Sequence, residues 1–180
     1  MYIFEDVKNW IMEDQFRSQC LDVASHLISG EWYIAAGFVR NLVWDRLHGY
    51  TESTALSDID VIYFNASNTS LAAEVIIENS LKSMMSDCNW SVKNQARMSD
   101  KHGHDAYQNC IDAMSFWPEI QTAIGVTKQT DGETRVVSPF SPEQVIKLAV
   151  TRNSKCTTQV YYGRLKNKDW IKTWPELKLE

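Results

Sequence analysis

The sequence lacks both a basic excess and a long apolar run. Its 18 Lys and Arg residues are outnumbered by 23 Asp and Glu residues, which gives a formal net charge of −5. A general nucleic-acid binder normally presents a basic face, so this balance argues against one but leaves room for a local basic cleft. No window approaches the ~20 apolar residues of a membrane-spanning helix. The charged, amphipathic residues 1–20 do not read as a secretory leader either, so we expect no membrane partner.

Paired cysteines are also missing. Cys20, Cys88, Cys110 and Cys156 are widely separated and form no Cys-x-x-Cys motif. This spacing argues against a disulfide framework and favours free thiols in a reducing compartment. We therefore expect a cytoplasmic protein.

The segment from Ser57 to Phe64 alternates in the way a strand does. Ile59, Val61 and Tyr63 would face one side, and Asp58 and Asp60 the other. Two adjacent carboxylates repel each other unless a cation lies between them. Mg²⁺ takes only one or two protein carboxylates and completes its shell with water and substrate phosphates. The pattern predicts a Mg²⁺ (or Mn²⁺) site at Asp58 and Asp60; the alternative is that Asp58 merely caps a turn.

An apolar strand at residues 33–36 precedes a glycine and a helix predicted over residues 39–48. The free N–H groups at a helix start can hold a phosphate. We predict that the amides of Gly37 and Phe38 do so, and that Arg40 adds positive charge. Two alternatives remain open: the Phe38 ring either crowds the phosphate or turns inward, and Arg40 is either a ligand or an ordinary exposed arginine. A metal beside a phosphate cradle points to phosphoryl or nucleotidyl transfer.

These residues carry a family resemblance. Ala36-Gly37-Phe38-Val39-Arg40-Asn41 followed by Asp58-Ile59-Asp60 resembles the nucleotidyltransferase superfamily, whose polymerase-beta-like fold includes tRNA CCA-adding enzymes. Ala36 replaces the first glycine of that motif and Asn41 its aspartate. From about Trp32 to Trp174 the chain is similar to a bacterial family of uncharacterised nucleotidyltransferase-like proteins, through the motifs at 92–98, 116–119 and 174–175. The resemblance implies the fold and an NTP substrate, but it leaves the acceptor unknown.

A third strand is predicted over residues 90–98, beside the Asp-x-Asp strand. The superfamily usually places a further carboxylate there, whereas this segment offers Lys93, Asn94, Gln95 and Arg97 and no acid. Asp112 and Glu119 are weaker candidates from the next segment. Polar residues in a strand beside a metal site suggest that Lys93, Asn94 and Arg97 bind nucleotide. An exposed edge strand protected by its charges is an equal alternative.

Taken together, the sequence predicts an α+β protein with a small mixed β-sheet and helices packed on it. One domain would span residues 1–180, with N-terminal helices at 4–29, a core at 32–150 and a C-terminal helical tail at 160–174. A hairpin is expected at residues 130–132 and a helix over 142–150. Residues 99–107, with His102 and His104, are expected to form an exposed loop, and Trp117 and Trp174 to act as packing anchors.

The leading hypothesis is a metal-dependent nucleotidyltransferase that moves a nucleoside monophosphate from NTP to a hydroxyl on a small molecule, RNA or protein. Asp58 and Asp60 would be its catalytic metal ligands. The alternative is a nucleotide- or partner-binding module that keeps the fold without the chemistry, which the missing acid and Phe38 favour. A purely structural domain ranks third. The oligomeric state is left open.

Overall fold

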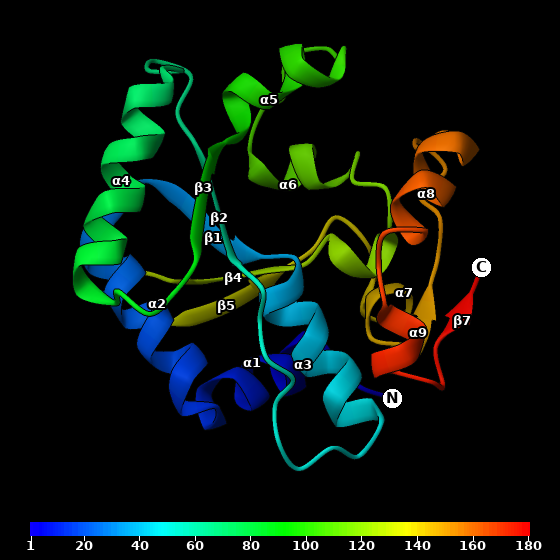
Figure 1. The fold of residues 1–180 in the computed structure, drawn as a ribbon. Coiled ribbons are helices and arrows are strands. Elements are labelled where there is room, and N and C mark those ends of the chain that lie inside the picture. Colours follow the sequence, from blue (N-terminus) through cyan, green and yellow to red (C-terminus); the bar gives the residue numbers. More distant parts are fainter.

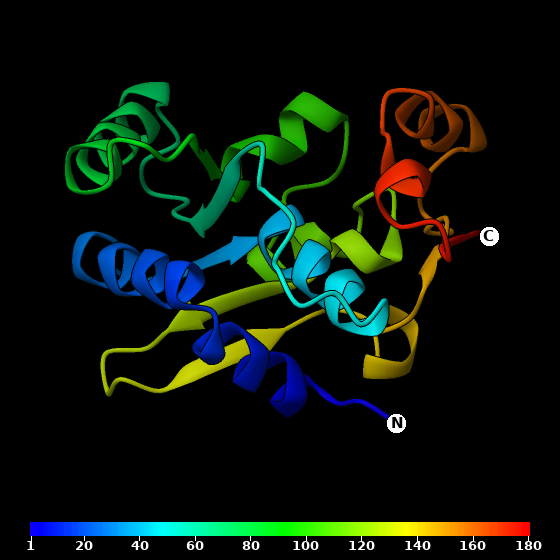
Figure 2. The same ribbon diagram turned by 60° about the horizontal axis from the view of Figure 1, so that its bottom comes forward.

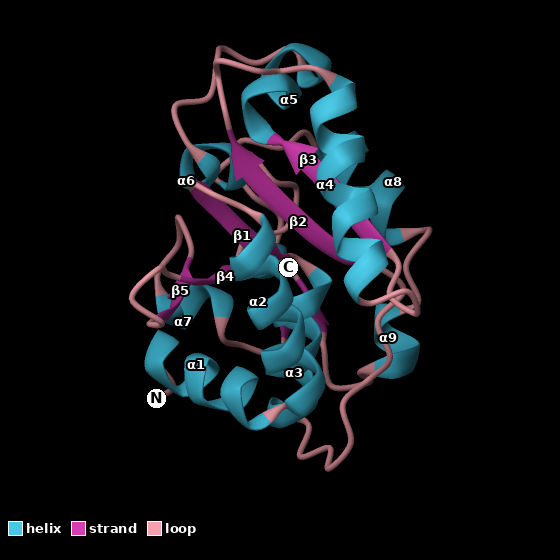
Figure 3. Ribbon diagram, turned by 90° about the vertical axis from the view of Figure 1, so that its left-hand side faces the viewer, coloured by secondary structure: helices cyan, strands magenta, loops and turns pink.

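A five-stranded mixed sheet forms the centre of the computed structural model, which describes residues 1–180 (Figure 1). The strands are β1 Glu31–Ala35, β2 Ile59–Phe64, β3 Trp90–Asn94, β4 Gly125–Lys128 and β5 Thr134–Val137. They lie in the order β3-β2-β1-β4-β5, which Figure 3 displays with the strands in magenta. β2 and β3 run parallel, and the other neighbours are antiparallel. The predicted α+β class and small mixed sheet are confirmed.

One face of the sheet is covered by four helices. These are α1 Phe4–Glu13, α2 Gln15–Leu27, α3 Gly37–Leu47 and α4 Leu71–Met84. Alternate strand residues meet their apolar sides, and Ile34, Val61, Val92 and Val126 all belong to this main core. The alternation read from the sequence therefore holds for β2 and extends to its neighbours.

The opposite face carries the polar strand residues. Because successive side chains alternate, Asp60 and Ile62 of β2 point away from the main core. Their partners in the parallel register are Ser91 and Lys93 of β3. This face is covered by α5 Gln95–His102 and α6 Cys110–Met114, and a small second core gathers around Ile62 and Met114.

The C-terminal part of the chain lies at the far end of the molecule from α4, as the orange and red segments in Figure 2 show. After β5 it contains α7 Pro142–Val145, β6 Ala149–Val150, α8 Thr158–Leu165, α9 Trp170–Thr173 and β7 Lys178–Leu179, while the 3-10 turn η1 Ile120–Thr122 precedes β4. β6 and β7 form a parallel two-stranded sheet. Trp174 Nε1 donates to Asp45 Oδ1 across 2.8 Å, which fixes the tail to α3.

Three sequence predictions about elements were wrong. The strand expected over residues 90–98 ends at Asn94, because the Asn94 side chain accepts from the Ala96 amide and caps α5. The loop expected at 99–107 therefore begins as helix, which ends at Gly103 in a left-handed conformation. The helix expected over 142–150 stops at Val145, and pairing with β7 extends the chain at 149–150. The hairpin at 130–132 was predicted correctly.

None of the helices is sufficiently long and apolar to cross a lipid bilayer.

Candidate active site

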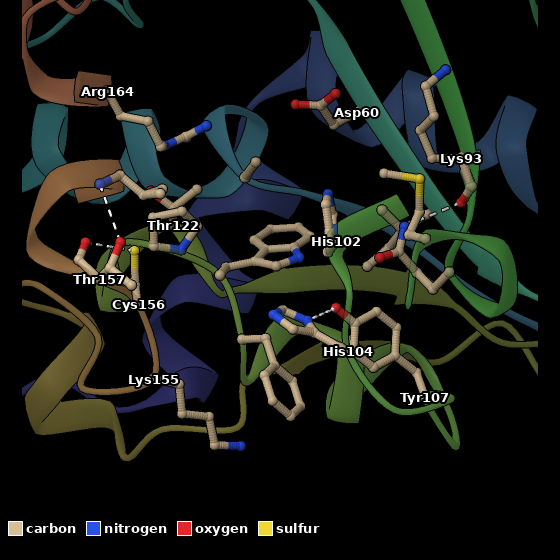
Figure 4. Close-up of a pocket in the computed structure, with 18 of the residues that line it drawn as sticks. Asp60, Lys93, His102, His104, Tyr107, Thr122, Lys155, Cys156, Thr157 and Arg164 are labelled. Atoms are coloured by element: carbon tan, nitrogen blue, oxygen red, sulfur yellow. Dashed lines mark hydrogen bonds between the residues drawn. The ribbon is translucent and has the colours of Figure 1, made fainter. Parts of the chain in front are cut away.

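A cavity of about 630 Å³ opens on the polar face of the sheet. Figure 4 shows Asp60 above it, with Arg164, Thr157 and Lys155 on one side and Lys93 and Tyr107 on the other. Strands β2 and β3, helix α5, the 115–118 turn and the segment from Lys155 to α8 all contribute to its wall. Its volume is within the range of cavities that take small organic ligands. The cavity therefore joins the Asp-x-Asp strand to segments about 100 residues away.

Asp60 is the carboxylate that lines this cavity. Burial raises the pKa of Asp60 above its ordinary value, and the negative charge of Asp58 raises it further. The Ser91 hydroxyl, Arg40 and Lys168 act in the opposite direction by stabilising the ionised form. Asp60 is thus a desolvated carboxylate beside a second negative charge, in a setting that attracts cations.

Asp58 lies one residue before β2 and is exposed. Ser57 Oγ donates to its Oδ1 across 2.7 Å. Its side chain borders a smaller hollow of about 340 Å³, which also contains Asp14 and Arg17, rather than the main cavity. The two aspartates are near enough for their charges to interact, while each opens onto its own hollow. That they share one metal remains a prediction.

The start of α3 follows a strained residue. Ala36 has φ 56° and ψ −123°, a conformation that a residue with a Cβ adopts at a cost, and it lines the cavity. No side chain caps the helix, so its first amides are not satisfied in that way. The Phe38 side chain has 0% exposure and packs in the main core. Between the two alternatives for this ring the structure selects the inward one, which leaves the backbone at Gly37 uncrowded.

Arg40 is buried rather than exposed. Its guanidinium lies between the rings of Trp44 and Trp170, 4.8 and 4.7 Å from their centroids. Nη2 donates to Asn41 Oδ1 across 2.7 Å, Nη1 donates to Thr122 Oγ1 across 3.3 Å, and Nε has no partner. Burial lowers the pKa of Arg40 to about 10, while Glu119, Asp60 and Asp58 oppose that shift. The exposed-arginine alternative is therefore excluded, and a fixed positive charge stands near the two aspartates.

The three polar residues predicted on the third strand have different surroundings. Lys93 lines the cavity. It is the register partner of Ile62, so its side chain lies on the same, polar face of the sheet. Asn94 is buried and bonds to the backbone of Asn65 and Asn68, which holds the loop after β2. Arg97 forks onto the carboxylate of buried Glu74, with Nη2 to Oε1 at 2.8 Å. The structure thus brings Lys93 to the cavity and leaves Asn94 and Arg97 outside it.

Neither candidate for a compensating acid lines the cavity. Asp112 accepts from the Gln108 amide across 3.0 Å, at the start of α6. Glu119 has 0% exposure and binds the guanidinium of Arg164 through both oxygens. Asp60 is consequently the one carboxylate in the cavity wall.

Several cavity residues were not predicted from the sequence. They are Met98, His102, His104, Tyr107, Phe116, Trp117, Lys155, Cys156, Thr157, Val160 and Arg164. The expected exposed loop is correct in part, since His102 is exposed at the end of α5 and His104 lies in the loop that follows. Both side chains nevertheless border the cavity, and half-buried His104 stacks on Phe116 with ring centroids 4.7 Å apart. Phe116 and Trp117 belong to the motif at 116–119 that contributes to the family resemblance, so this motif could have indicated them. No local pattern indicated that the segment 155–164 reaches the cavity.

The residues fit a hard divalent cation only in part. No group of three or more His, Cys, Asp and Glu side chains converges as a metal site. Mg²⁺ needs fewer, since water and phosphate oxygens supply the rest of its octahedron. The Asp60 carboxylate in the cavity wall, with the negative charge of Asp58 near it, is the arrangement that favours a bound cation.

Comparison with known proteins agrees with this geometry. The profile of the family described as nucleotidyltransferase matches residues 23–179, so the chain belongs to that family. A solved structure described as revealing a CCA-adding enzyme head domain is 25% identical, with a TM-score of 0.84, and the match covers 98% of this chain and 95% of that one. The predicted resemblance to nucleotidyltransferases is confirmed. Comparison with curated protein sequences gives no match.

Two more distant structures share the fold alone. A tRNA-processing enzyme in its apo form is 12% identical with a TM-score of 0.55, and the match covers 100% of this chain but 45% of that one. A tRNA-processing enzyme complex is 10% identical with a TM-score of 0.54, covering 83% and 40%. The chain therefore spans less than half the length of these two proteins.

Proposed function

We propose that the protein is a metal-dependent nucleotidyltransferase that transfers a nucleoside monophosphate from NTP to a hydroxyl acceptor. One observation carries this proposal: the Asp60 carboxylate and the uncapped start of α3, at Ala36, open onto the same cavity. A carboxylate that can hold a cation and amides that can hold phosphate are the two parts such a transfer needs.

In this proposal each residue has a defined task. Asp58 and Asp60 would hold Mg²⁺ or Mn²⁺, which when bound would supply positive charge to offset that of the phosphates. The amides of Gly37 and Phe38 bind the terminal phosphates, and the buried guanidinium of Arg40 adds a fixed positive charge behind them. Lys93 contributes a second charge from the opposite wall. Asn94 and Arg97 take no part, because their side chains are bonded elsewhere.

A second candidate is a nucleotide- or partner-binding module without chemistry. It is favoured by the composition of the cavity wall, in which Asp60 is the one carboxylate. On either proposal residues 1–180 act as one unit, because the tail packs on α3 through Trp174 and Asp45. The four free cysteines support a reducing, cytoplasmic setting.

Label transfer tests the proposal. The protein is incubated with each NTP labelled at the α-phosphate, with Mg²⁺ or Mn²⁺, and with RNA or a small-molecule extract as acceptor. We expect label on one acceptor class with the wild type and with Asp100→Asn, an exposed control outside the cavity. Asp60→Asn should transfer none.

The other outcomes separate the candidates. Nucleotide binding without transfer to any acceptor would favour the binding module. Transfer that survives in Asp60→Asn, or the absence of both binding and transfer, would contradict the nucleotidyltransferase proposal.

A further inference from the structure

Trp117 has an unpaired ring in the cavity wall. It is half-buried and is the one tryptophan that lines the cavity. The ring of its neighbour Phe116 already has two partners within the chain. The His104 ring lies 4.7 Å away between centroids, and the Lys155 ammonium lies 3.9 Å from the Phe116 centroid. The Trp117 side chain packs in part against the small second core around Ile62 and Met114, as the sequence predicted of a packing anchor. No aromatic ring or cation of the chain stacks on it, so the part that borders the cavity is available to a ligand.

The backbone around Trp117 is held by a buried side chain. Asn153, with 2% exposure, donates from Nδ2 to the carbonyl oxygens of Ser115 and Trp117 across 2.7 and 2.8 Å. The Asn153 amide donates to Pro118 O across 2.9 Å. These three hydrogen bonds fix the backbone that carries the indole before any ligand arrives. A ligand that stacks on the ring therefore does not have to order this backbone, which reduces the entropy lost on binding.

The charges of the cavity select the ligand. Lys93 and Lys155 line it against the single carboxylate of Asp60, whereas the guanidinium of Arg164, which also lines it, is paired with Glu119. In Figure 4 these cations lie on both sides of the cavity. A ligand for this wall combines negative charge with a flat aromatic ring, and a nucleoside triphosphate has both.

We infer that Trp117 is the platform on which the nucleobase of the NTP stacks, while its phosphates reach Asp60 and the start of α3. The inference rests on the proposed function and adds the part of the site that recognises the base. Stacking of a base on an aromatic side chain tolerates any base, because each has a π-face. Stacking on Trp117 therefore distinguishes nucleotides from polyphosphate, which has no base, but it does not distinguish one base from another.

Calorimetric titration with two probes tests the inference. The probes are ATP with a methylene group between its α- and β-phosphates, which cannot be transferred, and inorganic tripolyphosphate, both with Mg²⁺. We expect Trp117→Leu to weaken the ATP analogue about tenfold to a hundredfold and to leave tripolyphosphate unchanged. Trp117→Phe keeps a ring and should retain most of the affinity. Trp10→Leu, a half-buried tryptophan outside the cavity, should match the wild type.

Each other result has a defined meaning. Unchanged affinity of Trp117→Leu for the ATP analogue would overturn the inference and leave the proposed function standing. Equal losses for both probes would also overturn it, because Trp117 would then only support the fold. A wild type that binds neither probe would contradict the proposed function itself.

Discussion

Arg164 Nε donates to Glu119 Oε1 across 2.6 Å, and Nη2 donates to Oε2 across 3.2 Å. This pair joins α8 to the segment before η1, so it holds two sides of the cavity wall together. The carboxylate has 0% exposure and the guanidinium 40%. Glu119 is thereby committed to an ion pair and cannot act as a base for the reaction.

The unequal exposure of this pair predicts unequal effects on stability. Arg164→Met removes the hydrogen-bonded cation from the buried Glu119 carboxylate and leaves only the charge of Arg40 nearby, so it should lower the free energy of unfolding by about 3 kcal/mol. Glu119→Gln leaves a guanidinium that can turn to water and should cost about 1 kcal/mol. Urea denaturation of both variants measures the difference. Equal losses, or the reverse order, would show that this ion pair does not hold the two sides of the cavity wall together.

The strained conformation at Ala36 predicts a stabilising substitution. A glycine adopts φ 56° and ψ −123° without a Cβ penalty, so Ala36→Gly should raise the free energy of unfolding by about 1 kcal/mol. Ala35→Gly, one residue earlier in β1, is the matched control and should lower it by a similar amount. Denaturant titration checks both. A loss of stability in Ala36→Gly would mean that the backbone is not strained at this position.

The aspartate pair predicts an uncommon response to charge removal. The folded-state pKa of Asp60 is raised, so the folded protein binds more protons than the unfolded chain just above the ordinary aspartate pKa. The free energy of unfolding therefore falls as the pH rises from the ordinary aspartate pKa through the raised pKa of Asp60. At neutral pH the contribution of Asp60 to stability stays lower than it is in acid. Asp58→Asn with Asp60→Asn should flatten this slope and be at least as stable as the wild type at pH 7. A clearly less stable double variant would identify the aspartates as structural.

The same double variant reports on the ligand. Mg²⁺ with NTP at a hundred times its dissociation constant should stabilise the wild type by about 2.7 kcal/mol. The double variant should lose that gain, because the cation would have no carboxylates to bind. Thermal melts with and without the metal and nucleotide measure the effect. An equal gain in both proteins would place the metal–nucleotide site elsewhere.

Lys93 and Asn94 are sequence neighbours for which we predict opposite effects. Lys93→Met should weaken Mg²⁺–NTP binding about tenfold, because it removes a cation from the cavity wall, and it should change stability little, because the bond from Lys93 Nζ to the Val92 carbonyl is only part-buried. Asn94→Ala should cost about 3 kcal/mol of stability, since it leaves buried groups around Asn65 unsatisfied, and should leave affinity unchanged. Denaturation and calorimetry on both variants decide the matter. Loss of affinity in Asn94→Ala without loss of stability would return Asn94 to the binding residues.

Local sequence patterns were sufficient where a residue's role depends on its own strand or turn. The alternation from Ile59 to Phe64 separates core from polar face, because side chains of a strand point to opposite sides. The motif around Gly37 with the Asp-x-Asp tripeptide was enough to indicate the family and the α+β fold, which the comparisons confirm. The sequence pattern did not predict that β3 ends at Asn94 and that a helix begins at the next residue. A single asparagine side chain can end a strand by capping a helix, and no periodicity marks that event.

The sequence by itself thus determined the α+β class, the small mixed sheet and the two faces of the Asp-x-Asp strand, with Asp60 on the polar face. Only the tertiary structure decided which side chains share the cavity with that carboxylate. Trp117 and Arg164 reach it from segments far along the chain, and Glu119 is withdrawn from it by its ion pair with Arg164. The physical reason is that hydrophobic periodicity reports which face of an element is buried, whereas a binding site depends on distances between elements that no local pattern encodes.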